Sequence, residues 1–179
     1  MIGTHSIRNL ALIGFMGSGK SSVGRLAADL LHFTFLDTDH VIEARAGKTI
    51  TDIFQQDGEP IFRDWERRIV EELTRREKTV IATGGGMPAS EANLASLKTH
   101  ALVVCLWASP ETIWERVRGS AHRPLLNEAD PLEKIRQLLA AREPHYRQAG
   151  VLVNTERRSV REVAQHVIHQ FQMAQSTPR

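Results

Sequence analysis

One eight-residue segment, Gly14-Phe-Met-Gly-Ser-Gly-Lys-Ser21, constrains the fold of this chain more than any other feature. It matches the phosphate-binding loop pattern, in which two glycines, a lysine and a serine or threonine stand at fixed positions. An apolar run at 10–13 precedes the segment, and an amphipathic helical pattern follows it. A strand, a glycine-rich turn and a helix in this order form the context in which such a loop binds phosphate.

The residue types in this loop suit a nucleotide. Glycines let successive backbone N–H groups point at phosphate oxygens, and the positive end of the following helix adds to the attraction. Lys20 is placed to reach the β- and γ-phosphates, and the Ser21 hydroxyl is placed to hold Mg²⁺. A chance match in a glycine-rich turn, and a loop that binds nucleotide without turnover, are the alternatives. The loop residues that we expect to bind ATP are Gly17, Ser18, Gly19, Lys20, Ser21 and Ser22.

Short apolar runs alternate with longer helical patterns along the chain. We predict strands at 10–13, 34–36, 80–82, 102–107 and 151–153. Apart from Thr34, their residues are apolar rather than alternating, which is typical of a parallel sheet covered on both faces. Apolar spacing and capping residues predict helices between the strands. The alternation therefore predicts a three-layer α/β/α domain.

Composition narrows the range of functions. The 179 residues show no internal repeat or linker, so we expect a single domain over 1–179. The 23 basic and 21 acidic side chains nearly cancel and give no argument for a nucleic-acid or membrane partner. The longest apolar run, 101–108, is too short to span a bilayer, and residues 1–9 lack the apolar stretch of a signal peptide. The single cysteine, Cys105, indicates a buried thiol in a reducing cytoplasm.

Two carboxylates, Asp37 and Asp39, follow the second predicted strand. Ligands of open α/β sheets bind beyond the carboxyl ends of the strands. Alternate residues at a strand end point in opposite directions, so the two acids need not share a role. One could serve Mg²⁺, and the other could accept a proton from an attacking hydroxyl. The alternative is that Asp39 only caps a helix that begins near His40.

Three glycines and two arginines carry weaker signals. Gly84, Gly85 and Gly86 follow the third predicted strand, where glycine suits a close approach of backbone and ligand, although a plain turn is the simpler explanation. Arg63 lies near the start of one predicted helix, and Arg142 lies near the end of another, 130–143. The planar guanidinium of arginine suits a carboxylate or a phosphate, but for either residue taken alone a solvated surface position is the simpler explanation.

The segment 119–129 is polar, lacks periodicity and lies between two predicted helices, so we expect a mobile loop there. It contains Arg123. An arginine on such a loop could close over phosphates and neutralise developing charge. The alternative is a loop arginine without a partner.

Together these segments resemble the shikimate kinase family. The motifs that carry the resemblance occur in order as Gly14-x-x-Gly17-x-Gly19-Lys20-Ser21, Phe35-x-Asp37-x-Asp39-x-x-Ile42-Glu43, Ile53-Phe54-x-x-x-Gly58-Glu59-x-x-Phe62-Arg63-x-x-Glu66, Gly84-Gly85-Gly86, Arg123-Pro-Leu-Leu126 and Arg142-x-x-x-Tyr146. Many nucleotide-binding families share the first motif, whereas the second, third and last are much more specific. The resemblance covers nearly the whole chain. It implies a fold like that of nucleoside monophosphate kinases, with five parallel strands and a lid at 119–129.

The resemblance also implies an activity, which is transfer of the γ-phosphoryl group of ATP to the 3-hydroxyl of shikimate, with Mg²⁺. This step leads toward chorismate and aromatic amino acids, and the family expectation is a monomer in the cytoplasm. The implied catalytic residues are Asp39 as the base, Lys20 and Arg123, with Arg123 as the lid arginine on ATP. Asp37 would support Mg²⁺ through water.

The substrate contacts that the resemblance implies lie in three places. Helices at 39–76 would carry Asp39 and Arg63 to shikimate, and the backbone of 84–86 would meet it. Arg63 and Arg142 would take its carboxylate. Adenine contacts are implied around Arg116 and Arg158, and Arg157 competes with Arg158.

Two other functions compete with this interpretation. A gluconate kinase on the same fold would share the phosphate loop and the lid, and its substrate also has a carboxylate. A non-catalytic homologue that binds nucleotide or shikimate as a signal should have lost Lys20, Asp39 or a substrate arginine, and all of these are present.

Overall fold

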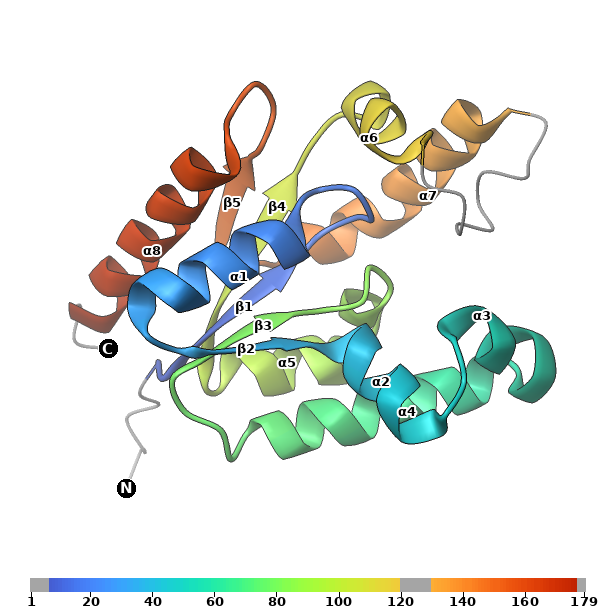
Figure 1. The fold of residues 1–179 in the computed structure, drawn as a ribbon, viewed down its shortest axis with the longest axis horizontal. Helices are drawn as coiled ribbons and strands as arrows, with labels where there is room; N and C mark the ends of the chain where they lie inside the picture. Colours follow the sequence, from blue (N-terminus) through green and yellow to red (C-terminus); the bar gives the residue numbers. More distant parts are fainter. Residues whose placement is uncertain (1–6, 120–129, 177–179) are drawn as a thin grey trace.

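The computed structural model describes residues 7–119 and 130–176. Five strands form one parallel sheet in the order β2-β3-β1-β4-β5 (Figure 1). They are β1 (Asn9–Ile13), β2 (Thr34–Asp37), β3 (Thr79–Ala82), β4 (Ala101–Trp107) and β5 (Val151–Asn154). Each predicted strand lies within one of them, so the predicted five-stranded parallel sheet is confirmed.

Alternate strand residues enter two apolar cores on opposite faces of the sheet. In β1, Leu10 and Leu12 join the core under α1 (Lys20–Leu31) and α8 (Val160–Ser176). Ala11 and Ile13 join the other core. The helices that close this second core are α4 (Glu59–Leu73), α5 (Glu91–Lys98), α6 (Pro110–Val117) and α7 (Pro131–Tyr146). Burial on both faces explains why β1, β3 and β4 lack polar alternation, whereas the edge strands β2 and β5 are partly exposed. The helices on both faces of the sheet confirm the three-layer α/β/α class.

Four helical segments connect β2 to β3 along the chain and lie beside the β2 edge of the sheet (Figure 1). Three are short, namely α2 (Thr38–Ala46), α3 (Ile50–Asp52) and the π-helical turn η1 (Ile53–Asp57), and the fourth is the 15-residue α4. A 3-10 turn, η2 (Met87–Ala89), follows β3. In the described part of the chain, no helix is long and apolar enough to cross a membrane.

The helix caps follow the sequence signals closely. Ser109 and Asp130 each cap a helix whose first residue is proline, and Ser159 and Glu162 bond reciprocally at the start of α8. One end differs from the prediction. Helix α7 continues to Tyr146, past the predicted end at 143, because Arg147 N still donates to the carbonyl of residue 143 and so closes the last turn.

A buried amide, Asn9, joins three strands at the end of the sheet away from the phosphate loop. Asn9 is fully buried, and its Nδ2 donates to the Arg76 carbonyl at 2.7 Å. Its Oδ1 accepts from the backbone N–H of Thr79, the first residue of β3, at 3.0 Å. His100, which precedes β4, places its Nδ1 3.0 Å from Asn9 Nδ2. One side chain therefore satisfies polar groups beside β1, β3 and β4.

We expect Asn9→Ala to lower the free energy of unfolding by about 2–4 kcal/mol, because it leaves the buried Thr79 N–H without a partner and removes the bond to the partly buried Arg76 carbonyl. Urea denaturation measures the change. Thr99→Ala is the matched control, since the Thr99 hydroxyl bonds to the Ser96 carbonyl at 2.7 Å but is exposed. An equal loss in both variants would contradict the role of Asn9.

Candidate active site

The phosphate loop connects β1 to α1 at the carboxyl edge of the sheet. Gly14, Gly17 and Gly19 adopt φ values of 137°, 77° and 100°, which side chains other than glycine rarely adopt. A Cβ atom on Gly14 would also lie 2.3 Å from the Leu106 carbonyl oxygen of β4. Lys20 Nζ donates to the carbonyls of Gly14 and Phe15, at 2.8 and 2.9 Å. The glycines thus permit the loop's turn, and the lysine is held over it.

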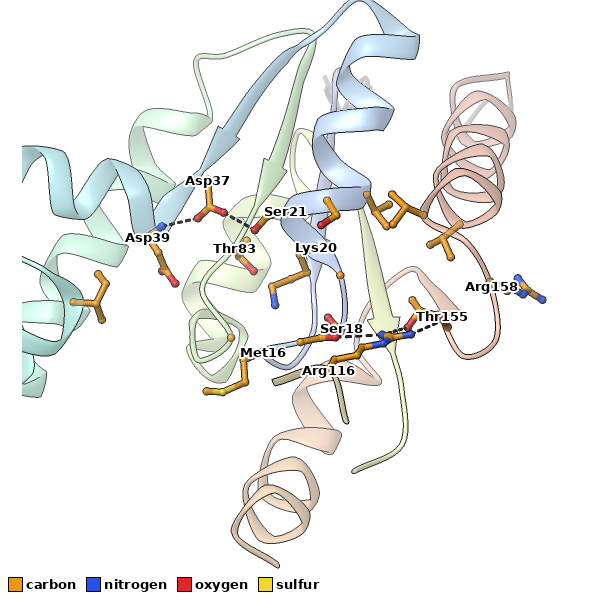
Figure 2. Close-up of a pocket in the computed structure, with 18 of the residues that line it drawn as sticks. Met16, Ser18, Lys20, Ser21, Asp37, Asp39, Thr83, Arg116, Thr155 and Arg158 are labelled. Atoms are coloured by element: carbon orange, nitrogen blue, oxygen red, sulfur yellow. Dashed lines mark hydrogen bonds between the residues drawn. The ribbon is translucent and has the colours of Figure 1, made fainter. Parts of the chain in front are cut away.

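The carboxylate of Asp37 joins this loop to the next helix. Its Oδ2 accepts from Ser21 Oγ at 2.8 Å, and its Oδ1 accepts from the backbone N–H of Asp39 at 3.2 Å (Figure 2). Helix α2 begins at Thr38, so Asp37 is its N-cap. The alternative in which Asp39 only caps a helix is therefore wrong, and the side chain of Asp39 is available for another role.

Asp39 lies in a largely dehydrated position beside the phosphate loop. Burial raises the pKa of its carboxyl to about 6, and the negative charge of Asp37 adds to the shift, while Lys20 and Arg63 oppose it. Its Oδ1 is buried and has no hydrogen-bond partner among the described residues. A carboxylate of this kind is suited to accept a proton near neutral pH.

One pocket of about 710 Å³ contains most of the predicted residues. Figure 2 shows Lys20, Ser21, Asp37 and Asp39 at this pocket, together with Arg116 and Arg158. The pocket lining includes the phosphate-loop residues 16–23, with the predicted residues Gly17, Ser18, Gly19 and Ser22. The volume is in the range of small-molecule sites.

The two predicted adenine contacts differ in their surroundings. Arg116 is engaged by the protein, since its guanidinium donates to the Gly17 carbonyl at 3.2 Å, to Thr155 Oγ1 at 3.0 Å and to the Thr155 carbonyl at 2.8 Å. Arg158 lines the pocket, whereas Arg157, with a φ of 53°, is not among the lining residues. The structure therefore favours Arg158 over Arg157.

Residues 84–86 bring the other predicted side chains together. A Cβ atom built on the first of these glycines would lie 2.5 Å from Asp39 Oδ1. On the second it would lie 3.4 Å from Arg142 Nη1, and on the third 2.8 Å from Arg63 Nη1. Each glycine thus admits one predicted side chain close to the backbone, which a plain turn does not require. Arg123 lies in 120–129, outside the described residues.

Glu66 and Tyr146 stand in the motifs that carry the family resemblance, but neither had a predicted role. Glu66 is 1% exposed, and its Oε2 accepts from Arg63 Nη1 at 2.7 Å. Burial raises the pKa of Glu66, and the bond to Arg63 opposes the shift. Tyr146 Oη donates to the Gly85 carbonyl at 2.7 Å. The three-residue spacing of Arg63 and Glu66 on a helix was the available signal for the first contact.

A phosphate loop with its lysine, a dehydrated aspartate and two arginines beside a glycine backbone define an ATP-dependent kinase of the P-loop class. The shikimate kinase family matches residues 16–172. The chain belongs to the shikimate kinase family.

Curated relatives agree with this assignment over nearly their full length. A shikimate kinase of Thermodesulfovibrio yellowstonii is 42% identical over 166 residues, which cover 93% of this chain and 96% of the relative. A shikimate kinase of Thiobacillus denitrificans is 48% identical over 153 residues, which cover 85% of this chain and 84% of the relative.

Solved structures agree as well. The shikimate kinase of Acinetobacter baumannii in complex with shikimate has a TM-score of 0.89 at 38% identity, with 97% of each chain covered. A gluconokinase of Sinorhizobium meliloti has a TM-score of 0.61 at 18% identity, with 94% of each chain covered, and this likeness concerns the fold alone.

The raised pKa of Asp39 predicts that Asp39→Asn stabilises the protein in metal-free buffer at neutral and alkaline pH. The folded chain binds the Asp39 proton more tightly than the unfolded chain, so ionisation of Asp39 destabilises the wild type as the pH rises through about 6. Because asparagine does not ionise, we expect the variant to be more stable by about 1–3 kcal/mol at about pH 8. The gain should vanish at about pH 4. Urea denaturation at both pH values is the measurement, and a pH-independent difference would contradict this account.

Proposed function

We propose that this chain transfers the γ-phosphoryl group of ATP to the 3-hydroxyl of shikimate. One observation carries the proposal. Asp39 lines one pocket with the phosphate loop, which carries Lys20, and it approaches the first glycine of residues 84–86, where Arg63 and Arg142 also approach the backbone. A hydroxyl beside Asp39 can then face ATP on one side while a carboxylate on the same small ring meets arginine on the other. The related enzyme of A. baumannii, solved with shikimate, supports this choice of acceptor.

The roles of the side chains follow from phosphoryl-transfer chemistry. The acceptor oxygen forms a bond to the γ-phosphorus, the bond from that phosphorus to the bridging oxygen breaks, and ADP leaves. Asp39 takes the proton of the acceptor hydroxyl, and its raised pKa makes it a better base than an ordinary carboxylate. Lys20 neutralises charge on the transferred group, and we retain Arg123 in the same role from the resemblance.

Arg63 is prepared for an anionic ligand by two different glutamates. The buried Glu66 holds Nη1, whereas Glu59, whose side chain is 60% exposed, holds Nη2 at 2.8 Å and Nε at 3.1 Å. A substrate carboxylate can replace Glu59 at modest cost, because an exposed ion pair contributes little. Glu66 can stay in place and keep the guanidinium oriented. Arg142, whose guanidinium lies 5.4 Å from the Phe15 ring centroid, would supply the second cation.

The pocket also suits Mg²⁺ and the nucleotide. Among residues 7–119 and 130–176, no group of three or more His, Cys, Asp or Glu side chains could hold a metal ion. A Mg²⁺ ion that binds ATP needs few protein ligands, since phosphate oxygens and water complete its shell. The hydroxyl of Ser21 and, through water, the carboxylate of Asp37 would hold it, and it would add positive charge at the phosphates. Arg158 and Arg116 would meet the adenine end.

The acceptor is tested by ADP release from Mg-ATP with shikimate, gluconate, a nucleoside monophosphate or no acceptor. We expect rapid release with shikimate alone, because only that acceptor of the three combines a ring hydroxyl with a carboxylate. Release with gluconate would retain the kinase mechanism and overturn the assigned acceptor. A protein that binds ATP but releases no ADP with any acceptor would support the non-catalytic alternative.

Substitutions separate the base from the carboxylate site. Asp39→Asn should abolish turnover without loss of folding, and a near-normal kcat would remove Asp39 as the base.

Arg63→Ala should raise the KM for shikimate about tenfold to a hundredfold, which corresponds to the loss of a charged hydrogen bond, and leave the KM for ATP unchanged. Arg67→Ala, on the same helix but with a 60% exposed side chain, is the control and should leave both constants unchanged. The monomeric state and the cytoplasmic location stay predictions.

A further inference from the structure

The short helix α3 lines part of the pocket, although it is not one of the helices that cover the two faces of the sheet. Ile50 and Thr51 of α3 line the pocket together with Asp39 and Glu43 of α2. Helix α3 has only three residues, and the π-helical turn η1 follows it directly. So short a helix makes few internal hydrogen bonds, and its position must depend on contacts with other elements.

Glu43 supplies such a contact. Ile50 is the first residue of α3, and backbone N–H groups in the first turn of a helix have no partner within that helix. Glu43 Oε1 accepts from the Ile50 N–H at 2.9 Å. Glu43 lies four residues after Asp39 on α2, so the two side chains project from the same side of that helix. The carboxylate that caps α3 thus comes from the helix that carries the predicted base.

The remaining bonds of this segment do not replace this contact. Thr49 Oγ1 accepts from the Asp52 N–H at 3.1 Å, which stays within the α3 turn. Lys48 Nζ bonds both carboxylate oxygens of Asp57 at 2.8 Å, which joins the two ends of the segment 48–57. Neither the Thr49 bond nor the Lys48 bond leaves the segment 48–57, so of the three contacts only the Glu43 bond connects α3 to α2.

We propose that Glu43 is a positioning residue, which holds Ile50 and Thr51 as the pocket wall beside the acceptor by capping α3 from α2. This inference rests on the proposed function, because it takes the Asp39 end of the pocket as the acceptor end. Loss of the cap leaves the Ile50 N–H unpaired and removes the hydrogen bond between α3 and α2, so that Ile50 is held there by its packing against the core alone. The acceptor then binds to a less ordered wall, whereas the phosphate loop on the other side of the pocket keeps its contacts.

The test compares Glu43→Ala with Glu43→Gln in the full chain. The glutamine amide oxygen can accept the same bond, so Glu43→Gln should keep the wild-type KM for shikimate and the wild-type exchange rate at the Ile50 amide. Glu43→Ala should raise the KM for shikimate about threefold to tenfold with an unchanged KM for ATP, as expected for the loss of one fixing hydrogen bond. Hydrogen exchange at the Ile50 amide should be faster in Glu43→Ala alone. Glu71→Ala, with a 77% exposed side chain on α4, is the control and should change neither measurement.

The possible results separate this inference from the proposed function. Equal effects of the alanine and glutamine variants, or an unchanged KM in Glu43→Ala, would overturn the positioning role. If the wild type does not phosphorylate shikimate, the proposed function fails. Hydrogen exchange at the Ile50 amide then decides whether Glu43 holds α3. An unchanged exchange rate in Glu43→Ala would overturn the capping role of Glu43 as well.

Discussion

The two oxygens of the Asp37 carboxylate connect the halves of the site. One accepts from Ser21, at the start of α1, and the other accepts from the N–H of Asp39, in the first turn of α2. The nucleotide side and the acceptor side are therefore positioned relative to a single side chain. Asp37 is itself fixed because β2 pairs in parallel with β3, which places Asp37 opposite Ala82. The same register carries the chain from Ala82 into residues 84–86, so the sheet determines where the predicted base, the phosphate loop and the three glycines meet.

Burial of charge in this region lowers the stability of the folded protein, and in the proposed mechanism it serves function. Asp39 and Glu66 both have raised pKa values because burial disfavours their ionised forms. For Glu66, the bond to Arg63 offsets part of the cost of ionising a buried carboxyl. The same bond keeps the Arg63 guanidinium oriented next to residue 86. Asp39 Oδ1 has no such partner among the described residues. A dehydrated carboxylate with one buried, unpartnered oxygen destabilises the folded protein when it ionises, and in the proposed mechanism it is well suited to take a proton from a substrate hydroxyl.

Features that depend on local sequence could be predicted, and features that depend on packing could not. The strands and the phosphate loop follow from apolar runs and from glycine spacing, which act over a few residues. Spacing alone left the roles of Asp37 and Asp39 open, because aspartate at a strand–helix junction serves equally as a cap or as a ligand. The burial of Glu66 was missed, since a glutamate among charged neighbours on α4 is typical of a solvated face. Only the packing of that helix against the sheet turns Glu66 inward.

The triple glycine shows how a site can be built from backbone contacts rather than from side-chain packing. Each of residues 84–86 would place a Cβ atom within 3.4 Å of a different functional side chain, whereas a Cβ on Gly47 would meet nothing within 4 Å. Peptide units deform far less than long side chains, so the three groups rest against a nearly rigid surface. Phosphoryl transfer depends on placement of the reacting atoms more than on covalent help from the protein. The closest approach is at Gly84, 2.5 Å from Asp39 Oδ1, so this glycine is the one on which the chemistry proposed for this pocket depends most.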